Sequence, residues 1–317
     1  MNPASHSDRP NPSWGQADSA STSSRLQVAF DDATIPSAGP DLLIALDVDG
    51  TLIANFNELS PRVARAIHNH LEAGTHIVLS TGRPVIEAQL ALQQLGIDAG
   101  FAVVTNGALV LTINHSFDER HNTQVPSVNR APEPDLFTFS QHTFNPHTTI
   151  TMLEERFERV EFAAESLHNK LRITPGFPDG ALLAQAEVVS KHEMMNDDDL
   201  LRLVACAPDV SPGHFFPMVE QMNLTDAEAT PGFNGWIDFA PAAVSKATGL
   251  AEVCEALGIP TAHTVAIGDS RNDVEMLRWA GVGIAMKTGR KHVESVASVV
   301  TDPIERDGAA LALELLL

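Results

Sequence analysis

From Asp41 onward the sequence alternates short apolar runs with longer helical patterns, and this alternation limits the possible folds more than any other feature. The run LLIALD (42–47) is apolar up to its last residue, as expected for a parallel strand covered on both faces. The segment SPRVARAIHNHLEAG (60–74) then fits a helix with Ser60 as N-cap and Pro61 in its first turn. HIVLST, VIEAQLALQQLG and FAVVTNGA repeat the pattern. This order predicts an α/β fold with a doubly wound (Rossmann-like), mostly parallel sheet.

Changes in composition divide the chain into further parts. Residues 1–38 are rich in Ser, Pro, Asp and Asn, which predicts a disordered N-terminal tail. Residues 122–236 mix helical patterns with short strand patterns and are richer in Pro, Phe, Met and acids, which indicates an inserted α+β domain. The strand–helix alternation then returns. We therefore expect one sheet domain, made of residues 39–121 and 237–317, interrupted by the insert.

The charge of the chain restricts its partners. Acidic residues number 41 against 20 basic ones, giving a formal charge of -21. Nucleic acids and anionic membranes require a basic surface, so neither is an expected partner, whereas a small anionic substrate needs only a local positive pocket. We find no apolar run of membrane-spanning length and no basic-then-apolar leader. Two cysteines without CxxC spacing, Cys206 and Cys254, favour a reducing, cytoplasmic location and argue against a zinc site.

Four aspartates lie where predicted strands end. Asp47 and Asp49 follow the first strand, Asp269 ends the strand HTVAIGD, and Asp273 opens the next helix. Because the working site of a doubly wound sheet lies beyond the carboxyl ends of its strands, these carboxylates should meet in one crevice. They would repel one another unless a cation lay among them. Oxygen-only ligands favour a hard ion, so we expect all four to take part in a Mg²⁺ site.

Groups suited to phosphate follow the same strand ends. Thr81 and Gly82 end HIVLST, and Lys246 begins a helix, whose N-terminus also attracts anions. Taken singly, each residue has a plainer explanation as a helix cap, a loop hydroxyl or a surface charge. The ordered set of DxDGT, TG, K and GDSxND is hard to explain that way. Together a metal, a lysine, a hydroxyl and a spare carboxylate describe a phosphoryl-transfer site.

These motifs resemble those of the haloacid dehalogenase superfamily of phosphohydrolases, within it the Cof-type branch with a large C2-type cap inserted in the core. The resemblance covers residues 41–317 and rests on DVDGT (Asp47 to Thr51), STGRP (Ser80 to Pro84), TNGA (Thr105 to Ala108), SK (Ser245 and Lys246) and GDSRND (Gly268 to Asp273). One departure is MKTGR, where Lys287 and Thr288 stand in place of the Asn that relatives often carry.

The resemblance implies a Mg²⁺-dependent phosphatase with two distinct aspartates. Asp47 would be the nucleophile that forms an aspartyl-phosphate. Asp49 would protonate the leaving oxygen and later deprotonate the attacking water. Asp47, the backbone carbonyl of Asp49 and Asp269 would hold the metal, with Asp273 ordering the groups around it.

By the same resemblance, Thr81 and Lys246 would bind the transferring phosphoryl group, and Lys246 would also hold the nucleophile. The remaining expected phosphate-binding or neighbouring positions are Gly50, Gly82, Arg83, Asn106 and Asn272. The cap would close over the site and contact the leaving group.

The substrate expected from the resemblance is a small phosphorylated metabolite, with sugar phosphates ahead of nucleotide or pyridoxal phosphates. A phosphotransferase or phosphomutase is the main alternative enzyme. A receiver-like signalling module would also accept phosphate on Asp, but the acid two residues later and the large insert argue against it. The same acid argues against a dehalogenase, which has no use for it. A non-catalytic binding protein has no support, since every chemical residue is present.

Overall fold

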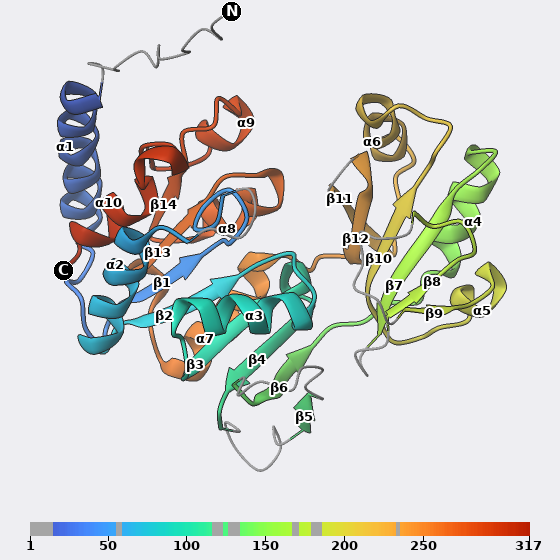
Figure 1. The fold of residues 1–317 in the computed structure, drawn as a ribbon, viewed down its shortest axis with the longest axis horizontal. Coiled ribbons are helices and arrows are strands. Elements are labelled where there is room, and N and C mark those ends of the chain that lie inside the picture. The colour runs from blue at the N-terminus through green and yellow to red at the C-terminus, as the bar shows by residue number, and fades with distance from the viewer. Residues whose placement is uncertain are drawn as a thin grey trace, which may run out of the picture.

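The computed structural model describes residues 15–54, 59–115, 123–125, 134–166, 171–178, 186–232 and 235–317. They form two sheets, each with its own helices (Figure 1). The helices and strands are α1 (Gly15–Ala33), β1 (Leu43–Leu46), α2 (Pro61–Glu72), β2 (His76–Ser80), α3 (Val85–Leu95), β3 (Gly100–Val104), β4 (Leu109–Ile113), β5 (Thr123–Val125), β6 (Leu136–Gln141), α4 (His147–Arg156), β7 (Glu161–Ser166), β8 (Leu171–Ile173), β9 (Glu187–Val188), α5 (Lys191–Met195), β10 (Leu200–Cys206), α6 (Pro212–Glu220), β11 (Ala227–Pro231), β12 (Ile237–Pro241), α7 (Lys246–Leu257), β13 (Thr264–Gly268), α8 (Val274–Trp279), β14 (Val282–Ala285), α9 (Lys291–Glu294), β15 (Val299–Val300) and α10 (Gly308–Glu314).

The larger sheet has nine strands in the order β15-β14-β13-β1-β2-β3-β4-β6-β5. The strands from β15 to β3 pair in parallel, whereas β4, β6 and β5 add an antiparallel extension. Side chains of α1, α2, α3 and α10 pack on one face, and those of α7, α8 and α9 on the other. This arrangement confirms the predicted doubly wound, mostly parallel sheet.

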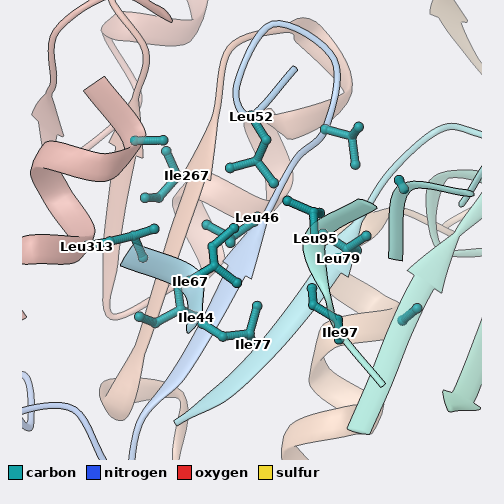
Figure 2. Close-up of a cluster of buried hydrophobic side chains, with 14 of the residues drawn as sticks. Ile44, Leu46, Leu52, Ile67, Ile77, Leu79, Leu95, Ile97, Ile267 and Leu313 are labelled. Atoms are coloured by element: carbon teal, nitrogen blue, oxygen red, sulfur yellow. The ribbon is translucent and has the colours of Figure 1, made fainter. Parts of the chain in front are cut away.

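Strand β1 shows why its sequence is continuously apolar. Ile44 and Leu46 point into a cluster with Ile67 of α2 and Leu313 of α10 (Figure 2). The alternate residues of β1 point to the opposite cluster, where Leu250 of α7 lies. All four side chains of the strand are fully buried, because helices cover both faces.

Helix α2 begins as its sequence predicts. The Ser60 hydroxyl accepts a hydrogen bond from the Arg62 amide at 3.2 Å, and Pro61 occupies the first turn. The chain turns after the helix at Gly74, whose φ of +85° lies in the left-handed region that glycine tolerates best.

The expectation that residues 1–38 form a disordered tail is wrong for the described part. Residues 15–33 form α1, and Leu26 and Phe30 on it are buried in the core. The Thr22 hydroxyl donates to Asp302 at 3.1 Å. Two large apolar residues one turn apart suffice for docking on a preformed core, although the surrounding composition is polar. Residues 1–14 lie outside the described residues.

The sheet topology also corrects the expected limits of the insert. Strand β6 belongs to the core sheet, although it lies within the predicted insert of residues 122–236. Strand β12 belongs to the smaller sheet, although it was expected in the core. The chain therefore crosses between the two domains near residues 142–146 and 242–245. Antiparallel hairpin strands extend the parallel sheet before the first crossing, and sequence composition does not mark that transition.

The inserted domain, called the cap below, is an α+β unit as predicted. Its six strands run in the order β11-β12-β10-β7-β8-β9. Residues of α4, α5 and α6 pack on one face of this sheet, with Phe162 and Phe239 among its buried members. In the described ranges no helix has the length and apolar character needed to cross a membrane. Cys206 in the cap and Cys254 in the core are both free thiols.

We predict that α1 is a structural part of the core. Replacing Leu26, which is fully buried, with Ala should lower the free energy of unfolding by about 2–5 kcal/mol, because a cavity replaces its contacts. Urea unfolding followed by circular dichroism measures the change. Val28→Ala in the same helix is the control, since Val28 is 56% exposed, and should shift stability by less than about 0.5 kcal/mol. Equal effects of the two substitutions would contradict the docking of α1.

Candidate active site

The candidate residues meet at one edge of the core sheet because the parallel strands end there together. Asp47 directly follows β1, Thr81 follows β2, Thr105 follows β3 and Asp269 follows β13. Lys246 begins α7, which packs against the same region of the sheet. Residues far apart in the sequence are therefore neighbours at this edge.

Lys246 is the centre of a buried charge cluster. Its Nζ donates to Asp47 Oδ1 at 2.5 Å and to Asp273 Oδ1 at 2.6 Å. Lys246 and Asp273 have no exposed surface, and Asp47 is 4% exposed. A lone ammonium would not be stable at this depth, so the two carboxylates are what keep the lysine charged there.

Burial and charge act in opposite directions on the pKa values of this cluster. Burial acts to lower the pKa of Lys246, but the charges of Asp273 and Asp47 outweigh it, so the pKa is raised. Burial, followed by repulsion from Asp273, raises the pKa of Asp47 to about 8, although Lys246 counters it. An additional cation would therefore stabilise the ionised form of Asp47.

Asp269 and Asp273 are held by backbone and side-chain donors. Asp273 Oδ2 accepts from the amides of Asp269 and Ser270, both at 2.9 Å. Asp269 Oδ2 accepts from Arg290 Nη1 at 2.6 Å. Burial, and next the charge of Asp273, raise the pKa of Asp269 to about 6, against the lowering effect of Arg290.

The acid cluster fits a hard divalent cation. Oxygen atoms of Asp47, Asp269 and Asp273 lie within 4.8 Å of one another. Asp269 Oδ1 is buried and has no hydrogen-bond partner in the part of the chain that the structure describes. Gly50 leaves room beside it, since a Cβ there would lie 2.6 Å from Asp269 Oδ2. Oxygen ligands and an unsatisfied buried carboxylate are the features that Mg²⁺ requires.

The carboxylate of Asp49 does not join this cluster. It is 61% exposed and accepts two hydrogen bonds from Arg83, one from Nε to Oδ2 at 2.8 Å and one from Nη2 to Oδ1 at 2.6 Å. Of the groups of Asp49, only the backbone carbonyl is still expected to bind the metal. The two aspartates of DVDGT thus have different surroundings, one buried beside Lys246 and one at the mouth of the site.

Two loops that carry the candidate phosphate-binding groups lie side by side. The Asn106 amide donates to the Thr81 carbonyl at 3.0 Å, and the Thr81 hydroxyl accepts from the Arg83 amide at 3.1 Å. Asn272 Nδ2 donates to Asn106 Oδ1 at 2.9 Å. A Cβ on Gly82 would lie 2.8 Å from the same Asn106 oxygen, so only glycine allows this approach. Five of the predicted positions therefore belong to one connected set: Thr81, Gly82, Arg83, Asn106 and Asn272.

The loop after β3 has an unusual backbone. Thr105, Asn106 and Gly107 have φ angles of 52°, 57° and 98°, all in the left-handed region. A β-branched residue rarely adopts this conformation, which is costly and concentrates at functional sites. A Cβ on Gly107 would lie 2.0 Å from the Ser245 carbonyl oxygen, directly before Lys246. The loop thus fixes the position from which α7 starts.

Sequence reasoning missed the role of Arg290. It singled out Lys287 and Thr288 in MKTGR, but both are exposed, and Arg290 of the same loop bonds Asp269. The sequence does contain a sign of this contact, because Arg290 is a cation in the loop that directly follows the strand pattern VGIAM. Ser270 caps the short 3₁₀ helix Arg271–Asp273, and its amide donates to Asp273.

A cleft of about 430 Å³ lies between core and cap beside the site. Its core wall includes Asn106, Lys246 and Asn272, and its cap wall includes Asn223 and Glu228. Arg271 of the core ion-pairs with Glu220 of α6, and its guanidinium stacks on Phe216 at 4.8 Å from the ring centroid. The cleft can hold a small molecule in contact with both domains.

A buried aspartate–lysine cluster at the carboxyl edge of a doubly wound sheet, next to an inserted cap, is the arrangement of an enzyme acting on phosphoryl groups. Residues 44–313 match the family model described as haloacid dehalogenase-like hydrolase, and the chain belongs to this family. It is a phosphatase of the haloacid dehalogenase type, a phosphoric monoester hydrolase of the Cof branch.

Relatives with phosphatase names match nearly the whole chain. The 5-amino-6-(5-phospho-D-ribitylamino)uracil phosphatase YitU of Bacillus subtilis is 27% identical over 282 residues, which are 86% of this chain and 96% of that protein. The phosphoglycolate phosphatase of Methanosarcina acetivorans is 24% identical over 273 residues, which are 86% of this chain and 95% of that one.

Solved structures share the fold. The sugar phosphatase BT4131 has a TM-score of 0.67 at 20% identity, covering 86% of this chain and 98% of that one. A haloacid dehalogenase-like hydrolase from B. subtilis has a TM-score of 0.67 at 21% identity, covering 87% of this chain and 99% of that one. These likenesses support the core-plus-cap architecture.

We predict that Gly107→Ala disables the site. The new Cβ would collide with the Ser245 carbonyl and displace Lys246, so kcat/KM for phosphate release should fall by about 100-fold or more. Gly258→Ala, at the other end of α7, is the matched control. It also has a left-handed φ, +69°, but no described atom lies within 4 Å of the added Cβ, so activity should stay near wild type. Near wild-type activity in Gly107→Ala would contradict the assigned role of this loop.

Proposed function

We propose that the protein is a Mg²⁺-dependent phosphatase that hydrolyses small phosphomonoesters through an aspartyl-phosphate on Asp47. The observation that carries the proposal is the contrast between the two aspartates of DVDGT. Asp47 is buried and bonded to Lys246, whereas Asp49 is exposed at the mouth of the site. A nucleophile must be fixed and kept ionised, and a general acid must reach both the leaving group and water.

In the first step Asp47 attacks phosphorus while the phosphorus–oxygen bond to the leaving group breaks. Asp49 gives its proton to the leaving oxygen, so the product departs as an alcohol. In the second step a water molecule returns a proton to Asp49 and attacks phosphorus, which frees Asp47 and releases inorganic phosphate. Lys246 holds the Asp47 carboxylate throughout and offsets the negative charge of the transferring group.

Asp47, Asp269 and the backbone carbonyl of Asp49 would hold Mg²⁺, with Asp273 fixing Lys246 and the Asp269 amide. When bound, the metal supplies positive charge that lowers repulsion between the carboxylates and the phosphoryl oxygens. Thr81, Gly82 and Asn106 offer a hydroxyl, backbone and an amide side chain for those oxygens. Gly50 and Asn272 line the same region, while Arg83 positions Asp49.

For the substrate we propose a small phosphorylated metabolite, with sugar phosphates first. The cleft beside Lys246 is of metabolite size, and its walls carry hydroxyl, amide and carboxylate groups suited to hydroxyl-rich leaving groups. The name of one neighbour includes sugar phosphatase, and that of one relative a phosphorylated ribitylamino compound. Phosphate release across a panel of phosphomonoesters, run beside an assay of sugar-phosphate isomerisation, would separate hydrolysis from phosphomutase activity.

We predict that turnover requires the metal. Exhaustive chelation should abolish phosphate release, and added Mg²⁺ should restore it, because the three buried acids otherwise repel the substrate. Ca²⁺ should bind, as seen by calorimetry, yet support turnover poorly, since its larger shell misplaces nucleophile and phosphate. Full turnover in the chelated protein would contradict the assignment of a metal site.

We predict that Asp47→Asn and Asp49→Asn differ in their dependence on the leaving group. Asp47→Asn removes the nucleophile, so every substrate should fail alike. Asp49→Asn keeps the backbone carbonyl but removes the proton donor, a loss typically worth about 10²–10⁴-fold. An alkoxide leaves poorly without a proton, whereas a nitrophenolate leaves readily. Rapid mixing should therefore show phosphorylation of Asp49→Asn slowing greatly with a sugar phosphate and far less with p-nitrophenyl phosphate.

Steady-state rates are not a substitute in this experiment, because Asp49 should also activate water in the second step. The wild-type enzyme with both esters is the control. If phosphorylation slows equally for the two esters, Asp49 is not the general acid, and the proposed division between the two aspartates is wrong.

A further inference from the structure

A carboxylate of the cap is buried against the core. Glu165 belongs to β7 of the cap sheet and is 3% exposed. Its Oε1 accepts a hydrogen bond at 3.3 Å from the amide of Val85, the first residue of α3 in the core. Amides in the first turn of a helix have no partner within the helix, so they are ready donors to an acidic group. This contact exists only when the cap lies on the core.

The surroundings do not neutralise Glu165. Arg202 lies opposite it on β10, but the Arg202 guanidinium is engaged with Asp238 of β12, through contacts of 2.9 and 2.6 Å. Glu87 of α3 adds a further negative charge nearby. If ionised, these four side chains hold three negative charges and one positive charge. Burial, countered only in part by Arg202, raises the pKa of Glu165 to about 7.

Two buried oxygen atoms at this contact lack partners. Neither Glu165 Oε2 nor Thr105 Oγ1 has a hydrogen bond among the described residues. They are neighbours, because the Thr105 hydroxyl acts to lower the pKa of Glu165, although burial raises it by more. Leaving both unsatisfied is costly. The Thr105 hydroxyl can donate to an ionised Glu165, but the buried charge then remains; with a proton on Glu165, Oε2 can donate to Thr105 Oγ1 instead, and the buried charge is removed.

The contact reaches both candidate phosphate loops. Val85 follows the STGRP loop that contains Thr81, and Thr105 directly precedes Asn106 in the left-handed TNG loop. The Thr81 carbonyl accepts from the Asn106 amide, so these loops are already bonded to each other. Glu165 of the cap therefore lies against the core beside both candidate phosphate loops.

We propose that Glu165 is a positioning residue that docks the cap onto both phosphate loops as a neutral carboxylic acid, so that cap closure takes up a proton. This inference concerns the cap and does not depend on the substrate or on the metal.

The direction of the pH effect follows from the pKa of Glu165 in the open and closed positions of the cap. With the cap open, Glu165 is in water and ionises in the ordinary range for a glutamate, whereas in the closed state its pKa is raised to about 7. The closed state therefore gains stability as pH falls below about 7 and loses it as pH rises through that value. Between pH 6 and pH 8.5 the ratio of closed to open molecules should fall about tenfold.

The test is a distance between cap and core in the full-length, metal-free protein. Spin labels on cysteines introduced at Val188 of the cap, 61% exposed, and His68 of the core, with a 68% exposed side chain, report that distance by pulsed electron paramagnetic resonance. The native thiols are buried, and a sample without the added cysteines shows whether they react. Distances are compared at pH 6 and pH 8.5.

The wild-type chain should show a mainly closed distance at pH 6 and a longer population at pH 8.5. Glu165→Gln should remain closed at both values, because the neutral amide can accept from Val85 and donate to Thr105. Glu161→Gln is the matched control: Glu161 is also buried on β7, but it bonds Thr174 within the cap at 2.8 Å, so the wild-type pH response should persist.

Two outcomes would overturn the proposal. One is an unchanged wild-type distance between the two pH values, and the other is a pH response in Glu165→Gln equal to that of Glu161→Gln. If Glu165→Gln does not fold, as judged by circular dichroism, Glu165→Asp takes its place. The shorter side chain withdraws from Val85, so the closed population should be smaller than in wild type at pH 6, and an undiminished population would reject the docking role.

Discussion

An ammonium group buried between two carboxylates is the interaction on which the site depends. Lys246 joins Asp47, at the end of β1, to Asp273, at the start of α8, and all three side chains are removed from water. Burying such charges is costly and is tolerated only when every partner is present in good geometry. Losing one partner would leave an uncompensated buried charge. The contacts that orient the candidate nucleophile therefore also hold β1, α7 and α8 together, so stability and chemistry constrain the same atoms.

Much of this site could be predicted from the sequence because it depends on local pattern and one general rule. Continuous apolar runs mark parallel strands, and parallel strands in one sheet end at the same edge. Asp47, Thr81 and Asp269 each follow such a run, so their proximity follows without knowledge of the strand order. The sequence did not predict that Asp47 and Asp49 have separate surroundings. Their shared position after the first strand placed both carboxylates in the crevice. In the structure the chain leaves β1 before Asp49, and Arg83 binds that side chain outside the acid cluster.

What the sequence could not predict depends on contacts between distant segments. Helix α1 has a composition typical of disorder, and Leu26 and Phe30 become core residues only because α10 and the end of the sheet offer a surface to cover them. The predicted residue limits of the cap were wrong for a related reason. Strand β6 joins the core and β12 joins the cap through pairing partners that no local pattern reveals. Arg290 likewise reaches Asp269 through the path of a loop. In each case the deciding energy comes from a surface formed elsewhere in the chain.

The two faces of the cap sheet contact different parts of the protein. One face packs Phe162, Phe239 and their neighbours against helices, which makes the cap a stable unit of its own. Toward the core it presents Glu165 and Arg202, along with Leu201, which joins the core cluster. Apolar surfaces of large area hold domains together firmly, whereas small and polar interfaces permit relative motion. A hydrogen bond to a helix N-terminus and an ion pair such as Arg271–Glu220 can break and re-form with water as the substitute partner. In the function we propose, the cap admits substrate and then excludes water, which requires contacts of this reversible kind. In the docking we propose for Glu165, one buried carboxyl group whose charge depends on pH makes the strength of these contacts adjustable.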